Sequence, residues 1–489
     1  MINFLPNDPA VAELPLREVA ALPERPAGSA RFAVAGSDAE QVYPFGTAGF
    51  LRWQSRQAAI LAVQAWEGAL GRPLTSWAAA VKGPLQVRPD AGVDLNAFYD
   101  RTGISFFHQE TGDHVTYSGA STDVVAHETG HAILDALRPD LWDTNLIEVG
   151  GAHEAFGDVT AVLTALSDRE TREELLAASP DLATANFVEA TAEDLSAGVA
   201  IALGPNHPAA APRRALNTFH WQLPETLPAD GGPDVVINEV HSIARILSGC
   251  FYDLVRALFT AGSERSEAGL LAAARRAAAL FWAGVAEAPE VPRFFRAIGR
   301  QMVIAAGPDS PAASAVGVAF AGHGLALGTR GLLAPELALA GAGPRFAAAQ
   351  SAGARIEVAD ATIADLRARL GAGADSPVTV SVVDLGSTRV AKVSFQLDVP
   401  LDGVDDRLRG VVCPATVPAL VGESGSTAAL LHAPRAGVAP EEALRFVRAL
   451  LDHGQLAIGD PAGPQPGWPT HAVVDRDGRR EVRRIAFTC

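Results

Sequence analysis

Hydrophobic residues recur at helical spacing in several long stretches of the chain. Between residues 53 and 70 the apolar positions fall on one side of a helix, which predicts a helix packed against a core. Four further stretches are long enough for helices: 124–137, 153–166, 241–259 and 267–285. Short apolar runs flanked by Pro, Asp and Gly predict strands at 85–87 and 104–107.

These predicted elements divide the chain into four parts. Residues 1–45 are rich in Pro, Ala and acidic residues without a sustained period, so we expect a loosely ordered N-terminal segment or one that lies along the surface. Residues 46–145 mix helix and strand, and residues 146–337 are mostly helical, which predicts an α+β unit of two lobes. After a Gly-, Ala- and Pro-rich linker at 338–344 the pattern changes, and a separate α+β domain is predicted over 345–489. Its expected elements are strands at 378–383 and 390–399, a helix at 441–451 and a hairpin-like pair around 475–478.

Composition narrows the possible partners. A chain of 489 residues exceeds the size at which one hydrophobic core stops growing, so several domains are expected. The formal net charge of −17 argues against a nucleic-acid partner, which needs clustered Lys and Arg. The longest weakly polar stretch, 312–327, contains His323 and is too short to span a bilayer, so no membrane partner is expected.

The cysteines and the first residues bear on the cellular compartment. Cys250, Cys413 and Cys489 are far apart and in no CxxC spacing, so free thiols are expected rather than a disulfide framework. The first residues lack the basic start and apolar run of a secretory signal. We therefore expect a cytoplasmic protein, with secretion by a non-standard route as the alternative; the oligomeric state is left open.

The stretch Asp123-Val-Val-Ala-His-Glu-Thr-Gly-His131 carries the HExxH pattern inside an apolar helical run. His127 and His131, four residues apart, share one helical face and can both reach one Zn²⁺. Glu128 is rotated about 100° around the helix and lies beside the open coordination position, where a carboxylate can take a proton from water. The pattern therefore predicts a catalytic zinc site with Glu128 as its base.

A catalytic zinc needs a third protein ligand. The metzincin arrangement, with a third His six residues after His131, is excluded because Leu137 stands there. Downstream, Glu154 lies in a second predicted helix, and Asp158 follows one turn later, where it can orient a zinc-bound His. His153 is a rival ligand, but it points away from the face shared by Glu154 and Asp158, so we expect it to be structural.

These residues resemble the thermolysin family of zinc metallopeptidases, the gluzincins. The resemblance extends over about residues 46–326, with its features in the same order as in that family. These features are the approach to the zinc helix from Ser118-Gly119, the pair Glu154 and Asp158, and the closing helix around residues 316–325. The resemblance implies a two-lobed thermolysin-like fold, one catalytic Zn²⁺ and a metalloendopeptidase (a protease that hydrolyses peptide bonds).

The resemblance also implies substrate-binding residues. Asn96 and Ala97, in Asn96-Ala-Phe-Tyr99, resemble the edge-strand segment that grips an extended peptide. His241, in Val240-His-Ser242, resembles the histidine that stabilises the oxyanion. Arg214 resembles the arginine that binds the substrate carbonyl, although its neighbour Arg213 is the alternative. Val124 sits where the family lines the pocket past the cut bond, which implies preference for a hydrophobic residue there.

The chain also departs from the family pattern. The aspartate partner of the oxyanion histidine would fall near Val236, so Asp234 or Glu239 must substitute or the partner is missing. Trp142 falls roughly where the family has a tyrosine. Of the structural calcium ligands only Asp123 is matched, and Ala165 replaces a key glutamate, so structural Ca²⁺ is not expected at that site.

The sequence therefore predicts a zinc endopeptidase acting on a peptide or protein substrate. In the expected mechanism Glu128 takes a proton from water and passes it to the leaving amine, while His241 and Arg214 stabilise the oxyanion. The alternative is a weak or inactive zinc-binding scaffold of the same fold, favoured if His241 has no partner. A zinc hydrolase acting on a non-peptide amide has no sequence feature of its own. The domain over 345–489 carries no motif, and could recognise substrates, inhibit in cis or mediate assembly.

Overall fold

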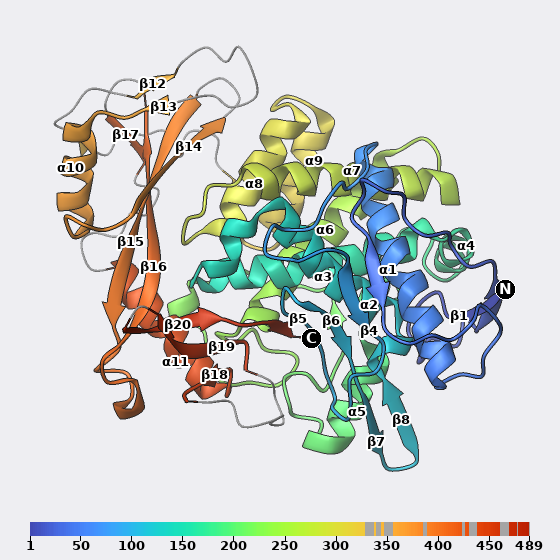
Figure 1. The fold of residues 1–489 in the computed structure, drawn as a ribbon. Helices are drawn as coiled ribbons and strands as arrows, with labels where there is room; N and C mark the ends of the chain where they lie inside the picture. The colour runs from blue at the N-terminus through green and yellow to red at the C-terminus, as the bar shows by residue number, and fades with distance from the viewer. Residues whose placement is uncertain are drawn as a thin grey trace.

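The computed structural model describes residues 1–327, 337–338, 344–346, 356–384, 389–422, 426–429, 438–459, 469–476 and 478–488. These residues form helices and sheets in about the places that the hydrophobic pattern predicts, and the α+β class is confirmed (Figure 1). Most of the predicted linker at 338–344 lies outside the described residues.

Three helices meet at the centre of the molecule: α1 (Ala48–Leu70), α2 (Thr122–Leu137) and α3 (Ile147–Ser167). The Thr47 side chain caps α1, and Gly71 ends it with a φ of 65° that suits glycine. Ser121 caps α2 by accepting a hydrogen bond from the backbone N–H of Val124. Most residues of α2, α3 and α6 are buried inside the protein.

Two glycines let α2 and α3 approach closely. A Cβ added at Gly157 would lie 2.5 Å from the ring of His127, and one at Gly130 would lie 2.7 Å from the hydroxyl of Thr160. Any side chain at these positions would therefore separate the two helices. The glycines fix how far His127 and His131 on α2 lie from the carboxylates on α3.

A mostly helical lobe surrounds this centre. It contains α4 (Arg169–Ala178), α5 (Glu193–Leu203), α6 (Val240–Ala261), α7 (Glu267–Glu287), α8 (Phe294–Ala306) and α9 (Pro311–Gly322). Helix α7 is long and apolar enough to cross a membrane, but 56% of its apolar window is buried inside the protein, which is typical of a core helix.

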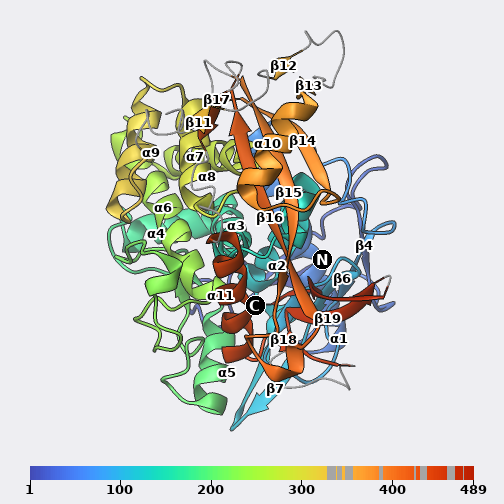
Figure 2. The same cartoon turned by 90° about the vertical axis from the view of Figure 1, so that its left-hand side faces the viewer.

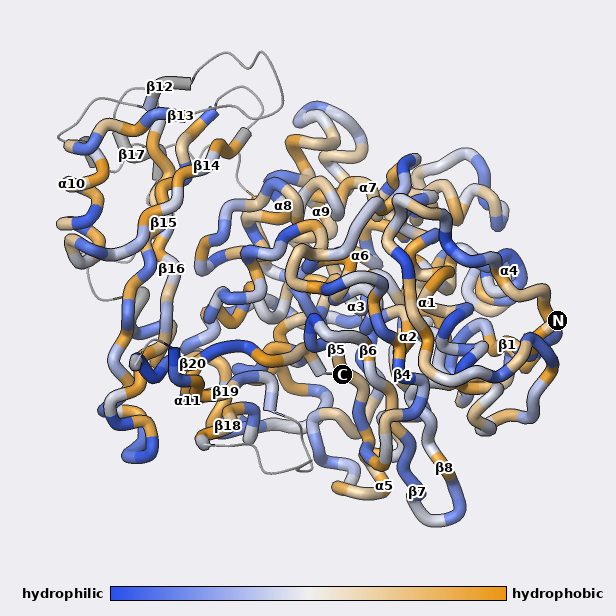
Figure 3. Tube along the Cα trace, in the orientation of Figure 1, coloured by the Kyte–Doolittle hydropathy of each residue, from blue (hydrophilic) through white to orange (hydrophobic). Residues whose placement is uncertain are grey.

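A five-stranded sheet borders α2, in the order β21-β5-β6-β4-β3. It contains β3 (Phe32–Val34), β4 (Leu85–Arg88), β5 (Ala97–Tyr99), β6 (Gly103–Phe106) and β21 (Phe487–Thr488). Strands β3, β4 and β6 run parallel, whereas β5 is antiparallel to both β6 and β21. A hairpin of β7 (His108–Thr111) and β8 (His114–Tyr117) projects beside it and is mostly hydrophilic (Figure 3).

The first 45 residues are more ordered than their composition predicts. Strand β1 (Ile2–Phe4) pairs with β2 (Arg17–Val19), and β3 joins the five-stranded sheet. Ile2 is fully buried, and Thr122 at the start of α2 donates a hydrogen bond from its backbone N–H to the carbonyl of Asn7. The segment therefore packs against α2, a long-range contact that local composition does not encode.

The remaining residues form a C-terminal domain around an eight-stranded sheet, whose long strands stand beside the helical lobe (Figure 2). Its elements are β11 (Leu337–Ala338), α10 (Asp360–Leu370), β14 (Val378–Asp384), β15 (Arg389–Pro400), β16 (Val411–Val421), β17 (Ser426–Ala429), α11 (Val438–Asp452), β18 (Leu456–Ala457), β19 (His471–Arg476) and β20 (Arg479–Arg484). A two-stranded sheet of β12 (Arg345–Phe346) and β13 (Ile356–Glu357) completes it.

The C-terminal domain packs directly on the rest of the protein. Val240 of α6 belongs to the same hydrophobic cluster as Val411 and Phe446 of the domain. The side-chain amide of Asn145 donates a hydrogen bond of 2.7 Å to the carbonyl of Pro414. The sequence predicted a separate domain, whereas the described contacts join it to the helices that carry the candidate site.

Candidate metal centre and active site

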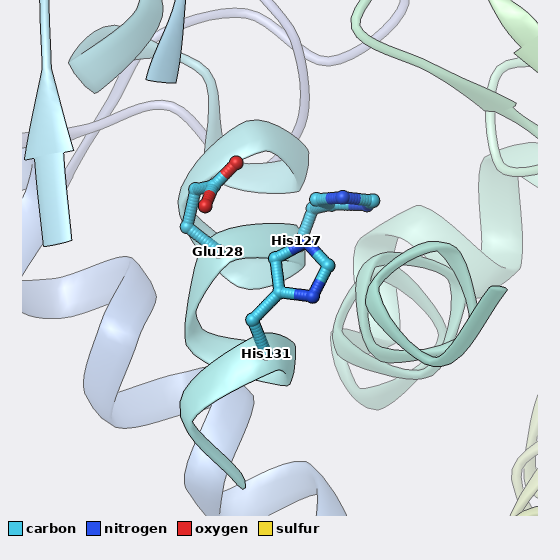
Figure 4. A group of neighbouring side chains, drawn as sticks. All are labelled: His127, Glu128 and His131. Atoms are coloured by element: carbon cyan, nitrogen blue, oxygen red, sulfur yellow. The ribbon is translucent and has the colours of Figure 1, made fainter. Parts of the chain in front are cut away.

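His127, Glu128 and His131 project from α2 and are all fully buried. Figure 4 shows the two imidazoles on the same side of the helix, one turn apart, with the carboxylate of Glu128 at a different angle around it. The rings of His127 and His131 lie with their centroids 4.8 Å apart at 87° to each other. The ligand atoms of the three residues are close enough to hold one metal ion.

Glu154, from α3, brings a third ligand atom to the two histidines. Its Oε2 lies 3.3 Å from Nε2 of His127 and 3.7 Å from Nε2 of His131. Two ligands that are each about 2.0 to 2.1 Å from a zinc ion at the tetrahedral angle lie about 3.3 Å from each other. The observed separations are therefore close to those of a tetrahedral zinc site.

These ligand atoms and the carboxylate of Glu128 are buried. Five of their polar atoms have no hydrogen-bond partner among the described residues: Nε2 of His127, Nε2 of His131, Oε2 of Glu154 and both carboxylate oxygens of Glu128. Burying unpaired polar atoms costs free energy, and such atoms usually have a ligand or water that satisfies them. The convergence of unpaired N and O atoms on one point fits a metal ion.

Asp158, one turn after Glu154, contacts the other ring nitrogen of His127. Its Oδ1 lies 3.1 Å from Nδ1 of His127 and accepts a hydrogen bond of 3.0 Å from Nε of Arg213, and its Oδ2 accepts one of 2.9 Å from the hydroxyl of Ser248. Burial alone raises the pKa of Asp158, but the charge of Arg213 and the hydrogen bonds from His127 and Ser248 lower it to about 2. Asp158 is therefore an anion that can fix the orientation of His127.

His153 is fully buried and lies beside His131. The Nδ1 atoms of the two rings are 2.9 Å apart, so one ring donates and the other accepts. The sequence predicted a structural role for His153, and the structure places it behind the predicted ligand His131. Burial and the neighbouring charge of Arg484 lower the pKa of His153 well below its usual value, which keeps this ring neutral.

Glu128 is fully buried, and the side chains of His127 and Glu154 act on its charge. Burial raises the pKa of Glu128 to about 8; the charge of His127 lowers it and that of Glu154 raises it. A carboxylate whose pKa lies near neutrality is suited to accept a proton and to release it again. This property agrees with the role predicted for Glu128.

His241 lies at the start of α6, and both of its ring nitrogens face acceptors. Nδ1 is 2.6 Å from Oε1 of Glu239, and Nε2 is 2.7 Å from the carbonyl oxygen of Thr488. Burial lowers the pKa of His241, but the charges of Glu154 and Glu239 raise it to about 10. Because both partners accept, His241 carries a proton on each nitrogen and is a cation.

The partner of His241 is therefore present. Of the two substitutes that the sequence allowed, Asp234 and Glu239, the structure selects Glu239, which also caps α6 by accepting the backbone N–H of Ser242. Nε2 of His241 lies 3.4 Å from Oε2 of Glu154, so this donor lies beside the candidate ligands His127, His131 and Glu154, here called the metal group.

The two neighbouring arginines diverge. They form β10 (Arg213–Arg214), which pairs with β9 (Ala190–Thr191). Arg213 reaches Asp158 and lies with Nη2 3.2 Å from Nδ1 of His127, whereas the half-exposed Arg214 pairs with Glu189. The sequence favoured Arg214, but Arg213 is the arginine at the metal group. Contact of either arginine with a substrate carbonyl stays a prediction.

The other residues that the resemblance implied for substrate binding lie at β5, in α2 and in the segment before α3. Asn96 and Ala97 lead into β5, and Asn96 is anchored because its carbonyl accepts a hydrogen bond of 2.8 Å from the hydroxyl of Ser118. Val124 is fully buried in the main hydrophobic core. Trp142, 6% exposed, packs edge-on against Tyr99 and lies under the guanidinium of Arg101. Their roles towards a substrate stay predictions.

A second acidic group lies at the N-terminal end of α2. Ligand atoms of Asp8, Asp123 and Glu193 lie within reach of one cation, and Oδ2 of Asp8 has no hydrogen-bond partner among the described residues. Burial and the charges of Asp123 and Asp8 raise the pKa of Glu193 to about 9. The sequence analysis considered only Asp123 of this group, and the expected absence of structural calcium stays a prediction.

Two residues at the site had no signal in the sequence. Phe487 packs on His131 and His153, and the buried guanidinium of Arg484 lies 4.0 Å from the ring of Phe487. Both come from the C-terminal domain, more than 300 residues from His127 and His131. No motif, period or spacing connects them to it.

No protein-family model matches the chain, and no curated protein matches it at a significant level.

Proposed function

We propose that the chain is a zinc-dependent endopeptidase with a two-lobed catalytic unit similar to that of the thermolysin-like enzymes. His127, His131 and Glu154 would hold the ion. One observation carries the proposal: the three unpaired ligand atoms converge at the spacing of a tetrahedral zinc site, with the carboxylate of Glu128 beside them. A purely structural zinc site needs no such carboxylate, and closed structural sites have four protein ligands.

The chain's own side chains supply the remaining chemistry. When bound, zinc supplies Lewis-acid polarisation of a carbonyl and lowers the pKa of water. Glu128 accepts a proton from the attacking water and delivers it to the leaving amine. His241, held as a cation by Glu239, donates a hydrogen bond to the oxygen on which negative charge develops. Asp158 keeps the ring of His127 in one orientation.

The substrate class follows from β5. This strand lies beside α2, and its backbone edge facing away from β6, which β21 pairs with in the described structure, is the edge on which a peptide would lie. An extended peptide can add to such an edge through main-chain hydrogen bonds. The resemblance adds preference for a hydrophobic residue after the cut bond, at the pocket expected near Val124.

The alternative of an inactive zinc-binding scaffold was favoured only by a missing partner for His241. The sequence left His241 without an assured partner, whereas Glu239 lies 2.6 Å from it. The buried Glu128 has a pKa shifted towards neutrality and no hydrogen-bond partner among the described residues, which is costly in a protein that performs no proton transfer.

The test compares wild type with Glu128→Gln, both loaded with zinc and incubated with a mixed peptide library. Zinc content is measured by mass spectrometry of the metal, and cleavage by mass spectrometry of the peptides. Glu128→Gln is expected to keep zinc and to lose about 10²- to 10⁴-fold in rate, as removal of a general base does. Glu148→Gln, which neutralises another buried glutamate outside the metal group, is the matched control and keeps its cleavage. Equal cleavage by wild type and Glu128→Gln would refute the mechanism.

A further inference from the structure

Strand β21 lies on the edge of β5 that a peptide substrate would use. Phe487 is paired with Tyr99 and Thr488 with Phe98, in antiparallel register. Because β6 covers the other side of β5, neither edge of this short strand is free in the described structure. Figure 1 shows the end of the chain reaching from the C-terminal domain to β5 in the catalytic unit.

The side chain of Phe487 fills the space beside the metal group. Its ring is stacked on His153 at a centroid distance of 3.7 Å and on His131 at 4.8 Å, and Trp142 packs against its edge. Phe487 is 1% exposed and belongs to the main core of the catalytic unit rather than to that of its own domain. An aromatic side chain is thus bound next to two histidines of the site.

The backbone of the same segment engages the predicted oxyanion donor. Nε2 of His241 donates a hydrogen bond of 2.7 Å to the carbonyl oxygen of Thr488. The same nitrogen would have to donate to a substrate oxygen during catalysis. Substrate and Thr488 therefore compete for one donor.

The C-terminal domain holds this segment in place. The carbonyl of Thr470 accepts a hydrogen bond of 2.8 Å from the backbone N–H of Ile485, and Arg483 forms an ion pair of 2.9 Å with Asp143 of the catalytic unit. The side-chain amide of Gln455 donates to Glu239, the partner of His241. The guanidinium of Arg484 is 95% buried, and the negative charge of Glu154 faces it.

We propose that the segment Ile485–Thr488 is a pseudosubstrate: it binds in cis as a peptide strand on β5, places Phe487 in an aromatic-binding pocket at the metal group, and blocks access until a substrate or partner displaces it. The inference rests on the proposed peptidase function. It selects inhibition in cis among the three roles that the sequence left open for the C-terminal domain. It also predicts that the pocket formed by His131, His153 and Trp142 accepts an aromatic side chain of the substrate.

The experiment uses the full chain with Phe487→Ala, a chain ending at Ile485, and Phe395→Ala as the matched control. Phe395 is equally buried but lies in the core of the C-terminal sheet, away from β5. Rates are measured with an internally quenched peptide, and amide hydrogen exchange is followed at residues 97–99. Far-ultraviolet circular dichroism checks that each variant is folded.

If the segment blocks the cleft, Phe487→Ala and the shortened chain raise kcat/KM by about tenfold or more, because the fraction of molecules with a free cleft increases. Exchange at residues 97–99 then becomes faster, and Phe395→Ala changes neither quantity. The peptide Arg-Ile-Ala-Phe-Thr, added in trans to the shortened chain, raises KM without changing kcat, and Arg-Ile-Ala-Ala-Thr inhibits far less. Folded Phe487→Ala protein with unchanged kcat/KM and unchanged exchange would overturn the proposal.

A binding measurement separates this inference from the peptidase proposal. Fluorescein-labelled Arg-Ile-Ala-Phe-Thr is titrated into Glu128→Gln, with and without Phe487→Ala, so that no turnover is needed. If the Phe487→Ala change tightens binding but no variant with intact Glu128 cleaves any peptide, the segment occupies a peptide-binding cleft in cis and the proposed activity fails. If peptides are cleaved but the Phe487→Ala change leaves binding unchanged, the activity stands and the pseudosubstrate inference fails.

Discussion

Asp158→Asn offers a quantitative test of how the site is supported. The carboxylate of Asp158 faces the Nδ1 atom of His127 and pairs with Arg213. Asparagine keeps the size of the side chain but removes its negative charge, so His127 loses its anionic partner and the charge of Arg213 is left uncompensated near the metal. Replacing the partner of a ligating histidine costs about 10- to 100-fold in metal affinity, equivalent to about 1.4 to 2.7 kcal/mol.

Asp135→Asn is the matched control for this change. Asp135 is a fully buried carboxylate on α2, one turn beyond His131, and it pairs with Arg101 and accepts a hydrogen bond of 2.8 Å from the hydroxyl of Tyr99. Both substitutions break a buried ion pair and should destabilise the fold by similar amounts, of about 3 kcal/mol or more. Only Asp158→Asn removes a contact to a predicted ligand.

The assay is competition for zinc with a chromophoric chelator at neutral pH. Burial, offset by Arg213, His127 and Ser248, leaves Asp158 with a pKa of about 2, so the wild-type side chain stays ionised throughout the working range. We expect Asp158→Asn to weaken zinc binding by the stated factor and Asp135→Asn to leave it within about twofold. If folded Asp158→Asn binds zinc as tightly as wild type, or if Asp135→Asn weakens it equally, the assignment of Asp158 is wrong.

Three further changes have defined outcomes. His241→Ala is expected to lower kcat by about 10²- to 10³-fold with little change in KM, because one oxyanion donor is lost; steady-state kinetics on the Phe487→Ala background measure this, and a change confined to KM would contradict it. Removing zinc with a chelator should lower the thermal unfolding midpoint, since a ligand at 100 times its Kd adds about 2.7 kcal/mol to the native state; an unchanged midpoint in calorimetry would argue against binding at this buried group. Burial raises the pKa of Glu148 from its ordinary 4.5 to about 7 in the folded protein. The free energy of unfolding therefore falls by about 3 kcal/mol as the pH rises from about 4.5 to about 7. Urea unfolding should show that Glu148→Gln lacks this loss, and the same pH dependence in both proteins would refute it.

Much of the local structure could be predicted because helix periodicity and capping act over a few residues. The stretch predicted as helix over 241–259 forms α6 at Val240–Ala261, and that over 124–137 forms α2 at Thr122–Leu137. The placement of His127 and His131 on one side of α2 follows from their spacing alone, because four residues make about one helical turn.

Choices between neighbouring residues were decided by tertiary structure. Arg213 and Arg214 are adjacent in a two-residue strand, so their side chains point to opposite faces, and the sequence does not say which face meets the metal group. Glu239 reaches His241 because it caps α6, whereas Asp234 lies in the preceding loop. The order of the N-terminal segment likewise depends on long-range packing, such as the hydrogen bond between Thr122 and Asn7.

The sequence by itself determined the elements that local spacing controls: the helices, the strands and the paired histidines with Glu128. It also placed Glu154 and Asp158 one turn apart on a second helix. Only the tertiary structure brought Glu154 to His127, and only it carried Phe487 and Thr488 from the C-terminal domain to β5. The physical reason is that a two-residue strand has no period of its own. Its position is set by the backbone edge, the aromatic pocket and the hydrogen-bond donor that distant parts of the chain assemble.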